Sequence, residues 1–291
     1  MKSVRQRERI NRAFFAAVVL MVLLTLIPLF LILGTMILKG APHLSWEFFT
    51  RVPPSTTEAM LAAQADTLSG QVRLPGGIVN GIAGTLIMTL LAALMAIPVG
   101  LLGGIYLSEK STGVLAKITR FSTDTLQGVP SIVIGIIVYA WVVKSMGGYS
   151  ALAGAVALAI MMLPLISRAT EETLNRLPRS LKESALALGC SYTTTVLRIL
   201  LPSAKSGLLT GILLALSRVM GETAPLMMTA LGSAFLVLTP TRPMSAVPLQ
   251  IWEFYNDPNL LPLIWSSSLF LLLLVLTLNL IAKRIASSHP A

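Results

Sequence analysis

Residues 181–202 read LKESALALGCSYTTTVLRILLP, a patterned stretch that lies between two long apolar runs. Its first half places Leu181, Ala185 and Leu188 at the spacing i, i+4 and i+7, which is one face of a helix. Gly189 is expected to end that helix, because glycine tolerates the left-handed backbone conformation of a helix C-cap.

The second half of this stretch predicts another short helix. Val196, Leu197 and Leu200 give it an apolar side, and Pro202 is expected to end it. Two short helices with a break between them form a hairpin whose apolar face needs a cover. On the pattern alone, this hairpin either lies in a groove of a partner protein or rests on the membrane surface without a partner.

The apolar runs beside the hairpin belong to a set of six. A transmembrane helix needs about 20 mostly apolar residues to cross the hydrocarbon core of a bilayer. The chain of 291 residues is 55% hydrophobic and 12% charged, with a mean hydropathy of +0.81. Soluble domains carry about 25% charged residues. We therefore expect an all-α integral membrane protein with six transmembrane helices, at about 14–38, 80–107, 126–143, 151–167, 208–236 and 260–282.

These spans divide the chain into three regions. Residues 1–79 are expected to hold the first transmembrane helix and a long periplasmic loop, since the first apolar run is too long for a cleaved signal peptide. Residues 80–282 form the main membrane domain, with a cytoplasmic loop at 168–206 that contains the hairpin. Residues 283–291 are a short cytoplasmic tail. In the second span, Gly100 and Gly104 lie one turn apart and allow a neighbouring helix to approach closely.

The basic residues predict the orientation in the membrane. Of the 22 Lys and Arg residues, 16 lie in segments that face inward if the N-terminus is cytoplasmic, and five lie in outer segments. This bias agrees with the positive-inside rule and places both termini in the cytoplasm. The net charge of +10 is explained by this orientation, so no nucleic-acid partner is expected.

Residue types that catalyse reactions or bind metals are scarce. The single cysteine, Cys190, excludes an internal disulfide, and His43 and His289 are far apart in sequence. The chain has no Gly-Lys pair and therefore no Walker A phosphate loop. We expect a transport subunit rather than an enzyme, with no metal and no cofactor on this chain. If ATP drives transport, another chain must bind it.

Arg218 and Glu222 are the two charges well inside an expected span. A charge near the bilayer centre costs about 2.5–3.5 kcal/mol, and at i, i+4 the two side chains are expected on one side of the fifth helix. They either form an ion pair that joins helices or line a route for an anion, since arginine presents a rigid fork of donors to phosphate oxygens. Pro225 is expected to kink the helix beside them. Thr223 and Arg168 complete the candidate route, although Arg168 is equally a positive-inside anchor.

The hairpin also resembles a known motif. Glu183, Ala185 and Gly189, followed after nine residues by Ile199, Leu201 and Pro202, match the EAA motif of ATP-binding-cassette importer permeases, with Ser184 in the place of a second alanine. The resemblance to the type I importer permease (MetI-like) fold covers about 80–282. In that family this loop carries the coupling helix, which sits in a groove of the cytoplasmic ATPase and transmits its closure. The resemblance implies the same role for 168–206.

Four further stretches narrow the resemblance. They are GIYLSE at 104–109, PSIVIG at 130–135, PLISRATEE at 164–172 and GILLALSRVMGETAPL at 211–226, and they are similar to the permease A subunits of phosphate-specific importers. The resemblance implies a subunit of an ATP-driven inorganic phosphate importer in a bacterial inner membrane. It also implies a sister permease subunit in a heterodimer, two copies of an ATPase that binds ATP and Mg, an extracytoplasmic phosphate-binding protein, and contact with membrane lipid.

Two other functions remain open from the sequence. The same architecture serves importers of other oxyanions, such as phosphonate or molybdate, although the Arg218–Glu222 pair favours a protonatable anion. An ion-coupled secondary transporter is the second alternative, because such proteins use intramembrane carboxylates and broken helices. The EAA-type loop argues against it, and dependence of transport on an ATPase distinguishes the two.

Overall fold

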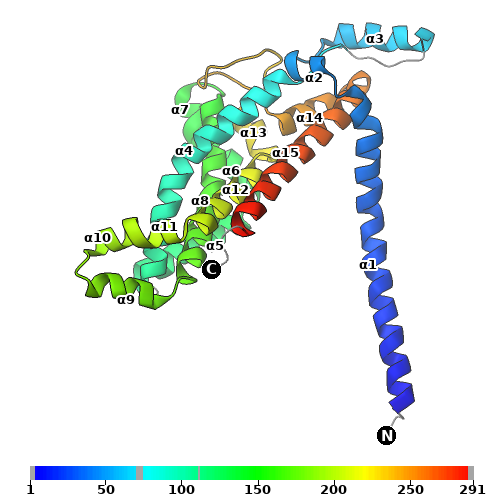
Figure 1. Cartoon of the computed structure of the whole chain (residues 1–291). Helices are drawn as coiled ribbons and strands as arrows, with labels where there is room; N and C mark the ends of the chain where they lie inside the picture. Colours follow the sequence, from blue (N-terminus) through cyan, green and yellow to red (C-terminus); the bar gives the residue numbers. More distant parts are fainter. Residues whose placement is uncertain (1–3, 70–74, 111, 288–291) are drawn as a thin grey trace.

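The chain is helical throughout the part that the computed structural model describes, residues 4–69, 75–110 and 112–287 (Figure 1). The elements are α1 (Val4–Gly40), η1 (Ala41–His43), α2 (Trp46–Thr50), α3 (Thr56–Ser69), α4 (Val79–Glu109), α5 (Val114–Gly128), α6 (Ser131–Val138), η2 (Tyr139–Val143), α7 (Lys144–Met146), α8 (Ala151–Asn175), α9 (Arg179–Ala187), α10 (Tyr192–Thr195), η3 (Val196–Leu200), α11 (Leu201–Ser203), α12 (Lys205–Val219), α13 (Ala224–Thr229), α14 (Val247–Tyr255), η4 (Pro258–Leu260) and α15 (Leu261–Ser287). Extended structure in these residues is limited to an isolated bridge between Leu231 and Met244.

The predicted fold class is confirmed, although two of the six spans are bent. Four helices, built on α1, α4, α8 and α15, are long and apolar enough to cross a membrane. Two bent pairs bring the number to six: Val114–Gly128 with Ser131–Met146, at 105°, and Tyr192–Ser203 with Lys205–Val219, at 71°.

The third span does not begin where the sequence predicted. Residues from 126 belong to α5, which ends at Gly128, and the span itself starts with α6 at Ser131. The reason is Pro130, whose ring disfavours a helical conformation of the residue before it and which therefore separates two helices. Pro130 is the N-cap of α6.

α4 and α8 form the central pair of the bundle. A Cβ atom on Gly100 would lie 2.8 Å from the side chain of Ile166, and one on Gly104 would lie 2.4 Å from Cβ of Thr170. The predicted close approach at these two glycines is therefore confirmed. Buried apolar side chains of α6, α12 and α13 pack against the same pair, among them Ile134, Val138, Ala215, Val219 and Leu226.

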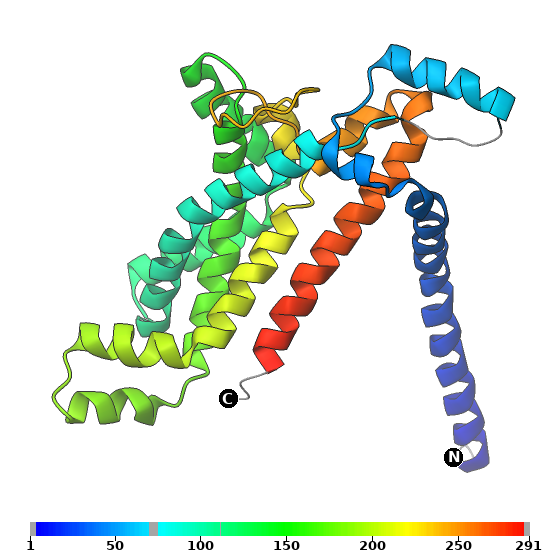
Figure 2. The same ribbon diagram turned by 45° about the horizontal axis from the view of Figure 1, so that its top comes forward.

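α1 stands apart from the bundle along most of its length (Figures 1 and 2). None of the residues in its most apolar window is buried. It meets α15 near its outer end, where the ammonium group of Lys39 lies 5.2 Å from the centre of the Trp265 ring. An apolar surface of this size is typical of a helix that lipid or another chain covers.

Short helices cover the outer end of the bundle. The predicted excursion at 55–69 forms α3, which starts with a capping interaction in which the Ser55 amide donates to Glu58 Oε2 at 2.9 Å. Below it, Phe48, Ile78, Val247 and Phe254 form an apolar cluster. α14 was not predicted; it lies between the predicted fifth and sixth spans, at 237–259, where the sequence indicated only a connecting segment.

The ends of the chain lie on the side of the hairpin. The N-terminal end of α1 and the C-terminal end of α15 both point toward the side of α9 and α10 (Figure 2), in agreement with the orientation that the charges predict. α15 is helical to Ser287, inside the predicted tail, while residues 288–291, with His289, lie outside the described residues. Residues 1–3 and 70–74 of the predicted first region also lie outside them.

Candidate functional site

The predicted cytoplasmic hairpin is present and projects from the inner end of the bundle (Figure 2). α9 ends as the sequence predicted. Gly189 has a φ of +83°, which is the left-handed conformation that glycine adopts without strain. Its amide donates to the Leu186 carbonyl at 3.0 Å, and the Cys190 amide donates to the Ala185 carbonyl at 3.2 Å. These two bonds form a Schellman cap.

The second helix of the hairpin starts at a serine cap and widens in its middle. Ser191 Oγ accepts a bond from the Thr194 amide at 3.3 Å, and Val196–Leu200 is a turn of π-helix. The helix then continues to Ser203, one residue beyond Pro202. At Ala204 it bends by 71° into the span that starts at Lys205, so the hairpin lies across the end of the bundle.

The buried face of the hairpin is smaller than the sequence predicted. Ala185, Val196 and Leu200 are buried, as expected. Leu188 and Leu197 are not: they are 84% and 57% exposed. Leu188 belongs to the cap, where the helical repeat has ended, and Leu197 lies in the π-turn, whose wider repeat changes the direction of its side chain. Leu188 and Leu197 are therefore apolar side chains that the hairpin leaves uncovered.

The residues of the EAA-type motif lie on both helices of the hairpin. Glu183, Gly189 and Pro202 are exposed, Ile199 and Leu201 are half-buried, and Ala185 is buried. The structure thus brings the predicted motif together into one element, with its charged residue on the outside.

The fifth span, which the sequence predicted as one helix from 208 to 236 with a kink at Pro225, is broken just before that proline. α12 ends at Val219, Met220–Thr223 is unwound, and α13 covers only Ala224–Thr229. Gly221 and Pro225 explain the break, because glycine weakens a helix, and proline lacks the backbone donor and its ring clashes with the carbonyl four residues earlier, which here belongs to Gly221. After α13 the chain leaves the span and forms a loop that returns to α4.

This break separates the two predicted intramembrane charges. Arg218 is exposed near the end of α12, and Glu222 is half-buried in the unwound turn beside Thr223. Among the described residues, no ion pair joins the Arg218 guanidinium to the Glu222 carboxylate. The prediction that both lie on one face of a continuous helix is therefore wrong, since the helical repeat does not extend across Gly221.

Arg168 lies apart from this break and has partners. Its guanidinium is 2.6 Å from Asp124 Oδ1 on α5 and 3.2 Å from Glu172 Oε1 on its own helix. Close by, Arg120 Nη2 is 2.7 Å from Glu171 Oε1. Two carboxylates offset the charge of Arg168, so the structure favours the anchor over the anion route for this residue.

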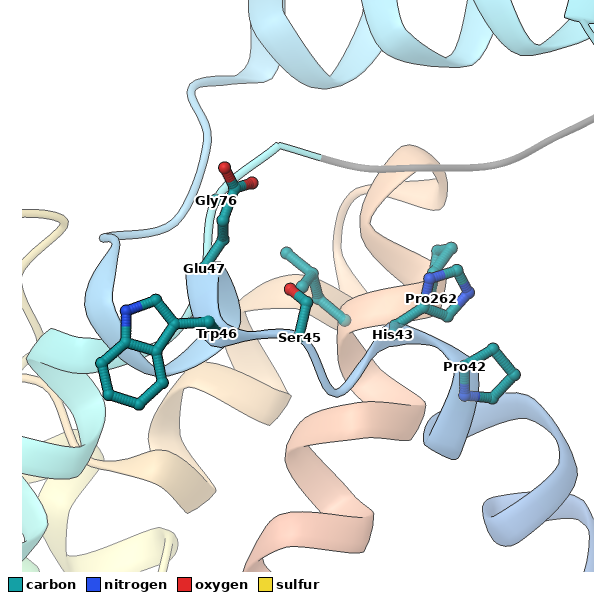
Figure 3. A pocket seen from close by; sticks show the side chains of 8 residues that line it. Pro42, His43, Ser45, Trp46, Glu47, Gly76 and Pro262 are labelled. Atoms are coloured by element: carbon teal, nitrogen blue, oxygen red, sulfur yellow. The ribbon is translucent and has the colours of Figure 1, made fainter.

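An outer pocket of about 460 Å³ lies between the segment after α1 and the start of α15 (Figure 3). Its lining includes Pro42, His43, Trp46, Glu47 and Pro262. The Trp46 side chain lies at one end of the labelled group, His43 and Pro42 lie toward the other, and the Glu47 carboxylate points away from them (Figure 3). The pocket holds none of the predicted site residues and its side chains do not converge on one ligand.

Comparisons with known proteins agree with this geometry. Residues 96–288 match the family model described as "Binding-protein-dependent transport system inner membrane component". The chain is 38% identical over 255 residues to the phosphate transport system permease protein PstA of Pasteurella multocida, covering 87% of this chain and 85% of the relative. It is also 38% identical over 284 residues to PstA of Yersinia pestis, covering 97% of this chain and 90% of that one.

A solved structure shares the fold. An inward-facing structure of the MetNI methionine ABC transporter superposes with a TM-score of 0.60 at 21% identity, covering 72% of this chain and 94% of the matched one. The family model and the PstA relatives, with which the fold agrees, define the class: a multi-pass inner-membrane permease subunit of an ABC importer, a transport subunit rather than an enzyme. Within this class, the chain belongs to the PstA family of permease proteins.

Proposed function

We propose that this chain is the permease subunit that forms half of the translocation pathway of an ATP-driven inorganic phosphate importer. The observation that carries the proposal is Arg218, which lies inside an apolar span of a PstA-family chain, next to the break at Met220–Thr223, and has no ion-pair partner among the described residues.

The exposure of Arg218 supports a route through the subunit interface. At 1.5 Å per residue, Arg218 lies about 20 Å along the axis of α12 from its start at Lys205, well inside the bilayer. The guanidinium is exposed in this chain, and an unpaired charge facing lipid costs about 2.5–3.5 kcal/mol. That cost is avoided if Arg218 faces a water-filled path lined by a second permease subunit. An anion in this path would accept charge-assisted hydrogen bonds from the guanidinium.

Glu222 and Thr223 extend the proposed anion route. The Thr223 hydroxyl is able to donate a hydrogen bond to a phosphate oxygen, and the Glu222 carboxylate is able to accept one from a protonated phosphate hydroxyl. Sulfate has no such proton near neutral pH, so Glu222 would repel it. The same arrangement therefore favours phosphate over sulfate inside the path.

The partners in this proposal follow from the hairpin and the family. The exposed surface of the hairpin, which includes Glu183, Leu188 and Leu197, docks one copy of a cytoplasmic ATPase, and a sister permease docks a second copy of it. ATP and Mg bind to the ATPase chains, and closure of the ATPase pair moves both hairpins. An extracytoplasmic phosphate-binding protein delivers phosphate to the outer face.

Transport by the complete complex in proteoliposomes tests the proposal. The variants are Arg218→Gln and Arg218→Lys, with Arg51→Gln as the control, because Arg51 is an exposed outer arginine paired to Glu47 at 3.3 Å. We expect Arg218→Gln to abolish phosphate uptake while assembly and ATP hydrolysis persist, and Arg218→Lys to retain part of the uptake. Normal uptake by both Arg218 variants would remove Arg218 from the route.

A second variant tests the hairpin. Glu183 is exposed on α9, and Glu183→Lys reverses a charge on the docking surface. We expect loss of uptake together with weaker binding of the ATPase. If ATPase binding and uptake are both normal, the hairpin does not dock through this face.

A further inference from the structure

Glu109 is the last residue of α4 and is placed against the hairpin. Its side chain is 18% exposed, and its Oε2 accepts a hydrogen bond from the ammonium group of Lys182 on α9, whose side chain is 33% exposed. The two residues are 73 positions apart in the sequence. Screening by water is weaker for a partly buried ion pair than for a surface pair, so this contact resists separation more than an exposed pair would.

The other helix of the hairpin reaches the same carboxylate. The ammonium group of Lys182 lies 5.4 Å from the centre of the Tyr192 ring on α10. The Tyr192 hydroxyl contacts Glu109, and partial burial together with this carboxylate raises the pKa of Tyr192 to about 12, so the phenol stays protonated. Both helices of the hairpin therefore converge on one side chain of α4.

α4 is able to pass a displacement deep into the membrane. It is a single helix from Val79 to Glu109, and Gly100 and Gly104 hold it in close contact with α8. Pro98 removes one backbone hydrogen bond inside α4, but the segment from Gly100 to Glu109 lies beyond this proline, and backbone hydrogen bonds fix each of its turns, so it moves as a rod. A force applied at Glu109 is thus carried to the central pair of the bundle.

The hairpin has weaker links at its two chain connections. Before α9 the chain passes through the short turn at 176–178, and after the second helix it bends by 71° at Ala204. Such breaks absorb changes in backbone angle, so a hairpin joined to the bundle by them alone could move without moving the spans.

We propose that Glu109 is a positioning residue that links the hairpin to α4, so that a displacement of the hairpin by the ATPase moves the α4–α8 pair. The inference rests on the proposed function and adds the contact through which the motion passes. Loss of the link is expected to uncouple ATP hydrolysis from transport and to leave the docking surface intact.

The test measures phosphate uptake and ATP hydrolysis in the same proteoliposomes, made with the complete transporter. The variants are Glu109→Gln and Lys182→Gln, and the control is Glu47→Gln, which makes the same chemical change in an exposed ion pair of the outer face. We expect the ATP hydrolysed per phosphate imported to rise about fivefold or more in Glu109→Gln, within the usual range of coupling between sites. ATPase binding and the Glu47→Gln ratio should match the wild type.

A cross-link separates linkage from a structural role. Glu109→Cys with Lys182→Cys, in a chain whose free Cys190 is replaced by serine, is joined by a short, reducible bis-methanethiosulfonate reagent. We expect the link to restore the ratio of uptake to hydrolysis and a reductant to abolish it again.

The outcomes distinguish the two proposals. If the wild-type complex imports no phosphate with ATP, the proposed function fails. If the wild type imports phosphate and Glu109→Gln keeps the wild-type ratio, or if the cross-link does not restore the ratio, the role of Glu109 is refuted and the proposed function stands.

Discussion

Gly104→Ala is expected to destabilise the central helix pair. The added Cβ would lie 2.4 Å from Cβ of Thr170 and 2.5 Å from the Ser167 carbonyl oxygen, whereas an ordinary contact is 3.4–4 Å. Because one of these partners is a backbone atom, a rotamer change cannot relieve the clash. α4 must therefore move away from α8 by about 1 Å. A gap of that size forfeits up to half of the dispersion energy of the contacts between the two helices.

The magnitude follows from two opposing effects. Overpacking a core costs about 1–3 kcal/mol, and a clash with backbone belongs in the upper half of that range. Replacing glycine by alanine in a helix returns about 1 kcal/mol. The net loss in the free energy of unfolding is therefore about 1–2 kcal/mol, and at about 2–4 °C per kcal/mol the Tm should fall by several degrees.

Gly34→Ala is the matched control. Gly34 lies in α1, and a Cβ there would meet nothing within 4 Å, so the same chemical change adds helix propensity without a clash. Thermal unfolding in detergent, followed by circular dichroism or by tryptophan fluorescence, compares the two variants. The reasoning is refuted if the Tm of Gly104→Ala equals or exceeds that of Gly34→Ala.

Two further predictions concern the path and the hairpin. Glu222→Gln should admit sulfate, because a neutral amide no longer repels a fully ionised anion. Uptake of labelled sulfate and of labelled phosphate by this variant checks the prediction. The prediction is wrong if the variant takes up sulfate no better than the wild type does and takes up phosphate equally well. Leu188→Ser should weaken binding of the ATPase about tenfold to a hundredfold, since burying a leucine contributes about 1.5–3 kcal/mol and Leu188 is 84% exposed before docking. Leu61→Ser is the control for it, as a 66% exposed leucine on the outer helix α3, and equal ATPase affinities for the two variants would exclude Leu188 from the docking surface.

Local features of the fold were predictable from the sequence. The apolar runs gave the approximate position of every span except the bent ones, and Gly189 gave the end of α9 because its left-handed conformation depends only on residues next to it. A close approach of some neighbouring helix at Gly100 and Gly104 was also predictable, since small residues one turn apart leave a shallow face on a helix. The partner helix was not predictable, because the spacing says nothing about which helix fills the face.

The remaining features depend on contacts between distant parts of the chain or on breaks in a helical repeat. The fifth span was predicted too long because hydropathy continues through the unwound turn and into the loop after α13, while the backbone does not. The signals for the break were Gly221 and Pro225, both visible in the sequence. The contact between Glu109 and Lys182 gave no such signal, since 73 residues separate them and each reads as an ordinary loop charge.

The break in the fifth span and the continuity of α4 have complementary mechanical consequences. A helix interrupted at Met220–Thr223 is able to change its angle there at little cost, and this is where the candidate anion residues Arg218 and Glu222 lie. α4 stays helical from Val79 to Glu109, and its segment from Gly100 to Glu109, which packs on α8, contains no proline, so this segment carries motion instead of absorbing it. A force that enters at Glu109 is therefore passed through α4 to α8, whose neighbours α12 and α13 meet at the break. The part of the span that is easiest to bend thus lies between Arg218 on α12 and α13, and a change of angle there would alter the position of Glu222 relative to Arg218.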